Sequence, residues 1–176
     1  WEKFVSNLIV VLMGGLSGER KISFLTGKAC SKALKKKGYK VVDLDAKGYF
    51  VVELKKLKPK MVFNALHGKY GEDGFVQSIL ESLKIPYTHS GVLSSSLAMD
   101  KELSRLIFIK NNLRVPKYFL LQKGHEENLN KKINNKKIKF PIVIKPINEG
   151  SSLGVSICKN KRQFTSKCKK LMENYD

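Results

Sequence analysis

The sequence predicts an α/β fold that starts with a doubly wound, Rossmann-like parallel sheet and continues into a smaller α+β unit. From residue 7 to residue 88, apolar segments of strand length alternate with segments of helical periodicity. This alternation is typical of parallel sheets covered by helices on both faces. After residue 100 the alternation stops, and residues 124–139 are polar and rich in lysine and asparagine. We therefore expect two domains, residues 1–96 and residues 97–176.

The first half contains four predicted strands and three predicted helices. The first strand, residues 7–13, leads through a glycine-rich turn into a helix over residues 23–37, with Leu25, Ala29 and Ala33 on one apolar face. Gly38 ends this helix, because glycine readily adopts the left-handed conformation found after helix C-termini. Further strands are predicted at residues 40–45, 61–65 and 86–88, and further helices at residues 51–57 and 75–83.

The second half has a thinner predicted core. A helix over residues 100–111 is expected to face inward through Leu103, Leu106 and Ile107. The remaining predicted elements are strands at residues 116–121, 142–144 and 155–158, and a helix over residues 162–173.

Composition narrows the function classes. The formal net charge of +19 raises nucleic acid as a partner. However, only four of the 34 basic residues are arginines and the lysines are dispersed, which favours a solvated surface over a nucleic-acid site. No apolar run has the length of a membrane helix, so we expect no membrane association and a cytoplasmic protein. The three cysteines lack metal-ligand spacing and are expected to be reduced thiols.

Residues 141–154 indicate a phosphate site. The β-branched run Ile142–Ile144 is typical of a strand buried on both faces, so Lys145 at its end is not expected to be an ordinary surface charge. The following loop offers backbone N–H groups and hydroxyls with little side-chain bulk, at Gly150, Ser151, Ser152 and Gly154. The lysine precedes the glycines, so the pattern is not a P-loop.

Glu19 ends the loop that follows the first strand. A carboxylate there would repel a pyrophosphate and is better suited to a cation such as a substrate ammonium. The alternative is an exposed helix N-cap carboxylate that pairs with Arg20 or Lys21. From this loop alone, the alternative is favoured.

His67 and Lys101 are two further candidates. His67 opens a loop with three glycines in eight residues at the end of a predicted strand, where sites are built. It could also merely order that loop, and His89 and His125 are read as structural or exposed. Lys101 opens a helix, where a cation opposes the dipole unless an anion binds. A single lysine in so lysine-rich a chain nevertheless needs no special explanation.

Taken together, these segments resemble the D-alanine–D-alanine ligases of the ATP-grasp superfamily. The resemblance extends from about residue 7 to residue 158 and follows the family's motif order. It is carried by residues 11–20, 65–68, 71–74, 86–92, 99–101 and 143–154. It implies an ATP-dependent ligase that joins two D-alanines through a D-alanyl phosphate for peptidoglycan synthesis. A related ligase that uses D-lactate as second substrate remains an alternative, as does a basic nucleic-acid-binding module.

The resemblance also implies roles for individual residues. Glu19, His67 and Ser151 would contact the substrates. ATP would be held by Lys101, Lys145, Gly150, Ser151, Ser152 and Gly154. The family's magnesium ligands would lie beyond Asp176, so no metal ligand is expected here and the chain alone is expected to be inactive. A first residue other than Met also suggests a partial chain, and the resemblance implies a homodimer for the longer protein.

Overall fold

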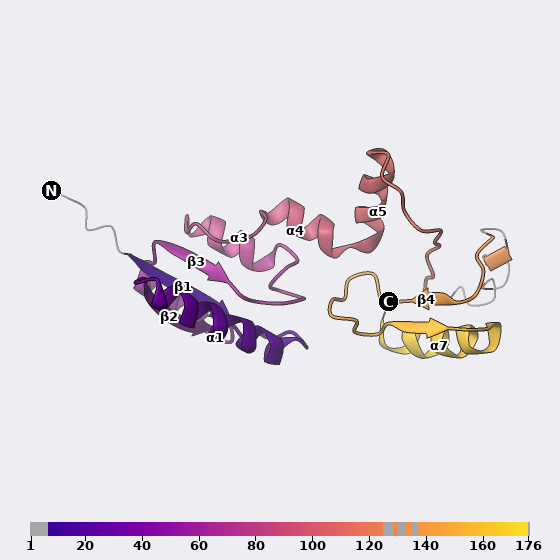
Figure 1. The fold of residues 1–176 in the computed structure, drawn as a ribbon, viewed down its shortest axis with the longest axis horizontal. Coiled ribbons are helices and arrows are strands. Elements are labelled where there is room, and N and C mark those ends of the chain that lie inside the picture. The colour runs from indigo at the N-terminus through magenta and orange to yellow at the C-terminus, as the bar shows by residue number, and fades with distance from the viewer. Residues whose placement is uncertain (1–6, 125–128, 130–132, 135–136, 176) are drawn as a thin grey trace. The chain divides into compact units, whose positions relative to one another are not determined.

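The computed structural model describes residues 7–124, 129, 133–134 and 137–175 (Figure 1). Contacts divide the chain into two compact units, Trp1–Asp100 and Lys101–Asp176, called unit 1 and unit 2 below. This division lies a few residues beyond the predicted domain limits. In the described parts of both units, no helix combines the length and the apolar character that a membrane crossing requires.

Unit 1 is built on a parallel sheet. Its strands β1 (Leu8–Met13), β2 (Lys40–Asp45) and β3 (Met61–Asn64) lie in the order β2-β1-β3. The predicted fourth strand is reduced to one parallel bridge between Val62 and Tyr87. Because the central strand β1 is almost entirely apolar, it is buried on both faces.

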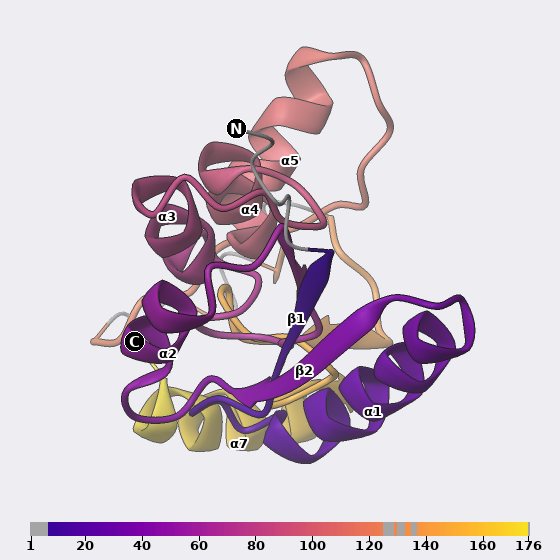
Figure 2. The same ribbon diagram turned by 90° about the vertical axis from the view of Figure 1, so that its left-hand side faces the viewer.

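Helices cover both faces of this sheet, which confirms the predicted α/β class. The helices of unit 1 are α1 (Arg20–Lys36), α2 (Phe50–Leu57), α3 (Phe75–Ser82) and α4 (Val92–Met99). Leu54 of α2 and Leu80 of α3 share a core cluster with Val10 and Leu12 of β1. Phe24 of α1 packs with the other face of the sheet. Figure 2 shows α1 on one side of the strands and α2 on the other.

Helix α1 differs from the prediction in the face that it buries. It begins at Arg20, and its buried residues are Ser23, Gly27 and Ser31, whereas Leu25 is 67% exposed. A Cβ atom on Gly27 would lie only 2.6 Å from the Cβ of Met13. The helix therefore contacts the sheet through its smallest side chains, and the predicted apolar face of Leu25 points away. Periodicity alone could not reveal this close approach.

Unit 2 combines a two-stranded sheet with helices. Its elements are α5 (Lys101–Lys110), β4 (Ile142–Ile144), β5 (Ser156–Cys158) and α7 (Lys161–Asn174). β4 and β5 pair antiparallel. Phe164 of α7 packs with Ile142, Ile144 and Cys158 from the two strands and forms the centre of this core.

In unit 1, Gly38 was predicted to end α1, and it adopts a φ of +85° as expected.

Three expectations for unit 2 are wrong. Val143 is 54% exposed, because β4 belongs to a two-stranded sheet whose buried face carries Ile142 and Ile144. Residues 116–121 form no strand, although Phe119 and Leu121 pack against the core. The helix α5 buries none of its residues, so its predicted inward positions are exposed; these are Leu103, Leu106 and Ile107.

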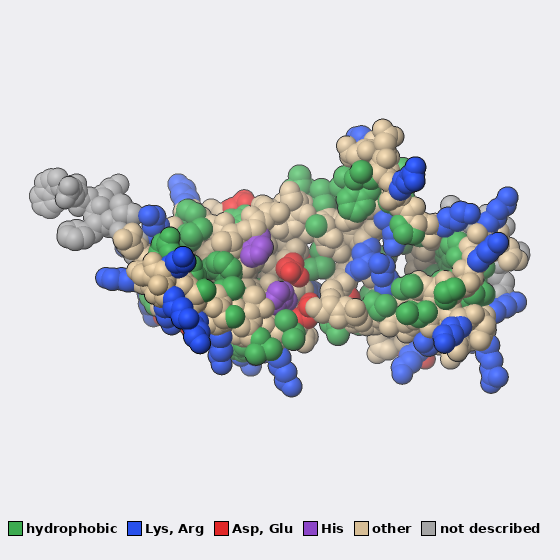
Figure 3. Space-filling model, viewed as in Figure 1, with side chains coloured by type: hydrophobic (Ala, Val, Ile, Leu, Met, Phe, Trp, Pro, Cys, Tyr) green, Lys and Arg blue, Asp and Glu red, His purple; other side chains and the backbone are tan. Residues whose placement is uncertain are grey.

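The charged side chains are dispersed and the cysteines are free thiols, as the sequence predicts (Figure 3). In Figure 3 the Lys and Arg side chains occur across the visible face and do not gather in one patch. Cys30, Cys158 and Cys168 are all free thiols. Burial raises the pKa of the Cys158 thiol and raises the pKa of Cys168 to about 12. Both buried thiols therefore stay protonated at neutral pH.

Candidate functional site

An ion pair fixes the loop between β1 and α1 in unit 1. The Arg20 guanidinium donates to both carboxylate oxygens of Asp45, at 2.7 and 2.6 Å, and to the carbonyl of Gly15 at 2.8 Å. The same carboxylate accepts from the Gly15 N–H at 3.1 Å. Arg20 also stacks over the ring of Phe24. The loop that leads to Glu19 is thus held at both of its ends.

This pair makes stability depend on pH. The hydrogen bond from Arg20 lowers the pKa of Asp45 below its usual value. A carboxyl with a lowered folded-state pKa stabilises the fold above the unfolded pKa of about 3.9 and loses that contribution as the pH falls through the folded pKa. We expect Asp45→Asn to lower the urea midpoint of unfolding at neutral pH, and the deficit to shrink below about pH 4.

A matched control is Asp43→Asn on the same strand. The Asp43 carboxylate is exposed and lies 3.9 Å from Lys35, so its loss should hardly change the midpoint. An Asp45→Asn deficit that is equally large at pH 3 and pH 7 would contradict the assigned cause.

Glu19 is a buried carboxylate, only 5% exposed. It occupies the N-cap position of α1, but its side chain makes no capping hydrogen bond. Gly68 lies directly against it, since a Cβ atom at that position would collide with the Glu19 carboxylate, and its φ is +66°. The alternative of an exposed carboxylate that pairs with Arg20 or Lys21 is wrong in its exposure, because Glu19 is buried, and Arg20 pairs instead with Asp45.

His67 lies at the start of the loop after β3, with its side chain 29% exposed. Its Nε2 is 2.9 Å from Oγ1 of Thr26 on α1. Its Nδ1 is 3.6 Å from the Glu72 carboxylate. The hydroxyl of Ser17 donates to the His67 carbonyl at 2.8 Å, which ties the two loops of unit 1 together.

Two buried amides shape this second loop. Asn64 and Gln77 both donate to the carbonyl of Gly71, each at 2.9 Å. The Gly68 N–H donates to Glu72 at 2.7 Å. Neither amide was predicted from the sequence; the available signal was a single asparagine inside the apolar run of β3, where an amide needs partners.

A cavity of about 240 Å³ lies beside His67 in unit 1. The exposed His89 is at its edge and contacts the Thr88 hydroxyl at 3.0 Å. The other predicted histidine, His125, lies outside the described residues. The cavity walls include Thr26, Phe63, His67, Gln77, His89 and Ser95.

In unit 2, the Lys101 ammonium is held by the backbone. It donates to the carbonyls of Ile147 at 2.9 Å and Glu149 at 2.6 Å. The Lys101 N–H also donates to Ile147 at 3.3 Å. These contacts explain why a cation is tolerated at the start of α5, and they attach that helix to the segment that follows β4.

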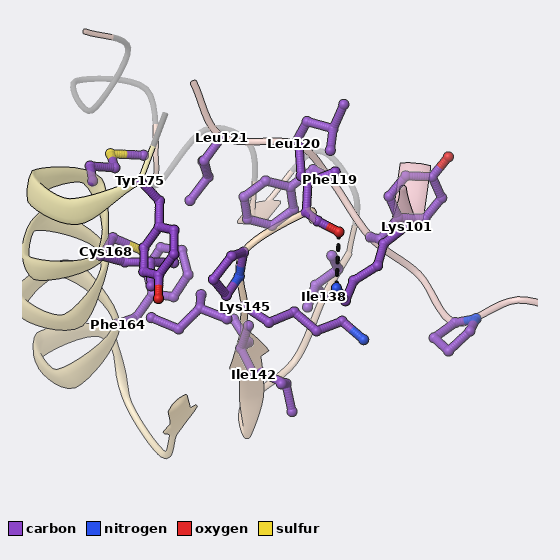
Figure 4. A pocket seen from close by; sticks show the side chains of 18 of the residues that line it. Lys101, Phe119, Leu120, Leu121, Ile138, Ile142, Lys145, Phe164, Cys168 and Tyr175 are labelled. Atoms are coloured by element: carbon purple, nitrogen blue, oxygen red, sulfur yellow. Dashed lines mark hydrogen bonds between the residues drawn. The ribbon is translucent and has the colours of Figure 1, made fainter. Parts of the chain in front are cut away.

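Lys101 and Lys145 both line a cavity of about 480 Å³ in unit 2. In Figure 4 their side chains extend towards each other, and the ring of Phe164 and the side chain of Leu121 lie on the apolar side. The apolar lining includes Phe119, Leu121, Ile142, Ile144, Phe164 and Met172. A cavity with an apolar wall and a cationic rim suits a ligand that joins a flat ring to an anionic tail.

The predicted phosphate loop follows this cavity wall in sequence but is not part of it. Ser151 and Ser152 have φ values of 42° and 62°, and Gly154 has a φ of 68°. A Cβ atom on Gly154 would lie 2.7 Å from Pro146. The loop therefore turns sharply in the left-handed region, where such backbone is sparsely populated outside glycine and is associated with functional sites.

The apolar wall of this cavity was not predicted from the sequence. The prediction for residues 116–121 is a strand, whereas in the structure they line the cavity. Tyr118 is held there by the Arg105 guanidinium, 4.4 Å above its ring. The available signal was the alternation of residues 118–121, because Phe119 and Leu121 pack against the core and Tyr118 and Leu120 do not.

The described residues place no three His, Cys, Asp or Glu side chains close enough together to hold a metal ion. The charged side chains that line the unit 2 cavity are all cations, which fit an anionic ligand and do not fit a metal; they are Lys101, Arg105, Lys117, Lys123 and Lys145. The expectation that the metal ligands are supplied elsewhere stays a prediction.

Comparison with protein families gives two matches in chain order. Residues 46–90 match the family model described as "D-ala D-ala ligase N-terminus", and residues 107–176 match "D-ala D-ala ligase C-terminus". The first match lies in unit 1 and the second in unit 2.

Individual relatives agree with these matches. A D-alanine–D-alanine ligase of Pelagibacter ubique is 53% identical over 152 residues, which are 85% of this chain and 49% of that protein. One of Rickettsia bellii is 42% identical over 168 residues, 96% of this chain and 49% of that protein. The chain thus spans about half the length of these relatives.

Solved structures extend the likeness to the fold. The D-alanine–D-alanine ligase of Bacillus anthracis has a TM-score of 0.83 at 37% identity, covering 96% of this chain and 54% of that one. Its complex with ATP has a TM-score of 0.81 at 35% identity, covering 96% and 56% of the two chains.

Proposed function

The chain belongs to the D-alanine–D-alanine ligase family, and on this basis we propose that it takes part in joining two D-alanine molecules at the expense of ATP. The observation that carries the proposal is the unit 2 cavity, which combines an apolar wall with the ammonium groups of Lys101 and Lys145. An adenine ring would fit the apolar wall, and a triphosphate would fit the two ammonium groups. A relative of this chain has been solved as a complex with ATP.

We assign ATP to unit 2. Bound ATP would supply the phosphoryl group that activates the carboxylate of the first D-alanine. Lys145 would offset the negative charge of the phosphates, which is the main task of a protein in phosphoryl transfer. Lys101 would contribute charge from a position fixed by Ile147 and Glu149. Gly150, Ser151, Ser152 and Gly154 would offer N–H groups and hydroxyls to the phosphates and the substrate.

We assign the first D-alanine to unit 1. Its ammonium needs a carboxylate partner in a site from which water is largely excluded, and the buried Glu19 offers one. His67 precedes Gly68, the glycine that lies against the Glu19 carboxylate. The proposed role of His67 is to contact that first substrate.

Further parts of the proposal rest on the family alone. The dipeptide would serve peptidoglycan synthesis, magnesium would accompany ATP, and the longer protein would be a homodimer. An enzyme that consumes ATP is expected in the cytoplasm, where ATP is made.

The test uses a chimera, because the chain spans about half of its relatives. In the ligase of Pelagibacter ubique, the segment that this chain matches is replaced by the chain itself. We expect the chimera to release phosphate from ATP and to form D-alanyl-D-alanine, detected by mass spectrometry. The purified 176-residue chain should form none. A folded chimera that hydrolyses no ATP and forms no dipeptide would refute the proposal.

The same assay separates the two ligase types. With D-lactate offered beside D-alanine, the proposal predicts dipeptide as the main product. A predominance of the ester D-alanyl-D-lactate would instead favour the related ligase that uses D-lactate.

A further inference from the structure

Thr26 is the candidate, because it contacts His67 and has no role in the function proposed above. Its Oγ1 lies 2.9 Å from the Nε2 of His67. Thr26 lies on α1, one residue before Gly27, whose close packing on Met13 fixes that part of the helix against the sheet. The hydroxyl is therefore presented to the imidazole from a rigid element.

The other ring nitrogen of His67 faces a carboxylate. Nδ1 lies 3.6 Å from Oε1 of Glu72, and Oε2 of Glu72 accepts the Gly68 N–H at 2.7 Å. An ionised carboxylate only accepts hydrogen bonds, so it favours the imidazole form that carries its proton on Nδ1. In the neutral ring Nε2 is then an acceptor, and its partner must be a donor. The Thr26 hydroxyl is such a donor.

We propose that Thr26 is a positioning residue that holds His67 in one orientation and in its Nδ1–H tautomer. This inference rests on the proposed function, in which His67 contacts the first D-alanine. A ring whose Nε2 is hydrogen-bonded to Thr26 and whose Nδ1 faces the Glu72 carboxylate presents a single face to the substrate. Without the hydroxyl, Nε2 loses its donor, and the ring can rotate or exchange its proton between the two nitrogens.

The decisive measurement is the tautomer of His67 in the 176-residue chain. The ¹⁵N shifts of the imidazole distinguish Nδ1–H from Nε2–H, and the signal is assigned by its loss in His67→Gln. We expect the neutral ring to show one tautomer in the unaltered chain. Thr26→Val keeps the β-branched shape without the hydroxyl and should give a mixture. Thr26→Ser keeps the hydroxyl and should restore the single form.

Glu72→Gln provides a second variant, in case Thr26→Val does not fold. The Glu72 side chain is half exposed, and the change removes only the charge that favours the proton on Nδ1. It should shift the population towards Nε2–H. A tautomer that is unchanged in both Thr26→Val and Glu72→Gln, or one that Thr26→Ser does not restore, would overturn the inference.

Activity in the chimera shows whether the positioning serves the reaction. We expect kcat/KM for D-alanine to fall about tenfold in Thr26→Val, as for a misplaced contact group, and to return with Thr26→Ser. A changed tautomer with an unchanged rate would overturn the link to the reaction. An inactive chimera that still contains Thr26 would count against the proposed function, whereas the ¹⁵N measurement decides the role of Thr26 independently.

Discussion

Lys145→Ala is expected to lower the ligation rate of the chimera by about 100-fold or more, the loss typical when a group that stabilises transition-state charge is removed. Lys145 is exposed and lines the unit 2 cavity at the end of β4. Its removal would leave a bound triphosphate without one of the cationic partners that we propose for it, while the core beneath β4 remains complete. The free energy of unfolding should therefore stay within about 0.5 kcal/mol of the unaltered value.

The matched control is Lys139→Ala, which removes the same charge from an exposed position outside the cavity. Because the net charge changes equally, a specific role predicts a large effect for Lys145 and almost none for Lys139. A second measurement is the affinity of the 176-residue chain and its two variants for ATP, measured by isothermal titration calorimetry. Equal losses in the two variants would indicate a general electrostatic effect and would refute the assignment.

Phe164→Ala is expected to destabilise unit 2 by about 3–5 kcal/mol, the range for removing a fully buried aromatic ring. Phe164 has no exposed surface and lies at the centre of the unit 2 core. Edge-to-face contacts link it to Phe119 and Phe140, at centroid distances of 6.3 and 6.4 Å. Its ring also lines the cavity, so the substitution should disturb the apolar wall as well as the core.

Hydrogen exchange followed by mass spectrometry suits this variant, since it reports each unit of the chain separately. Peptides from unit 2 should lose protection, while peptides from unit 1 should keep it. Ile157→Ala is the control, because Ile157 is 58% exposed on β5 of the same sheet. Loss of protection in Ile157→Ala as large as in Phe164→Ala would contradict the assigned core.

The parallel sheet of unit 1 was predictable, because its strands are apolar runs of strand length separated by clear turn signals. β2 was predicted with its full length, and β1 and β3 to within one residue. The buried face of α1 was not predictable, because it depends on how closely Gly27 approaches Met13. That distance is a tertiary property and leaves no trace in the periodicity of a single helix.

The site residues also divide into those that the sequence could predict and those that depend on tertiary packing. Lys145 was singled out in the sequence by its place before a small-residue loop, and it lines the unit 2 cavity. The partners that support the site residues could not be predicted, because Thr26 and His67 lie 41 positions apart and meet only in the folded structure. The apolar wall of the unit 2 cavity was misread for a related reason. Residues 116–121 have strand composition, but no described neighbour forms a ladder with them.

The carbonyl contacts of Lys101 limit how far the loop after β4 can travel. The ammonium binds the carbonyls of Ile147 and Glu149, and the ladder of β5 begins at Ser156. Between these two anchors lie the six residues 150–155, whose extended contour is about 20 Å. An arc fixed at both ends reaches out by about half its contour, roughly 10 Å. Any closure of this loop over a ligand would therefore be a short, local movement of residues 150–155 between the two anchors.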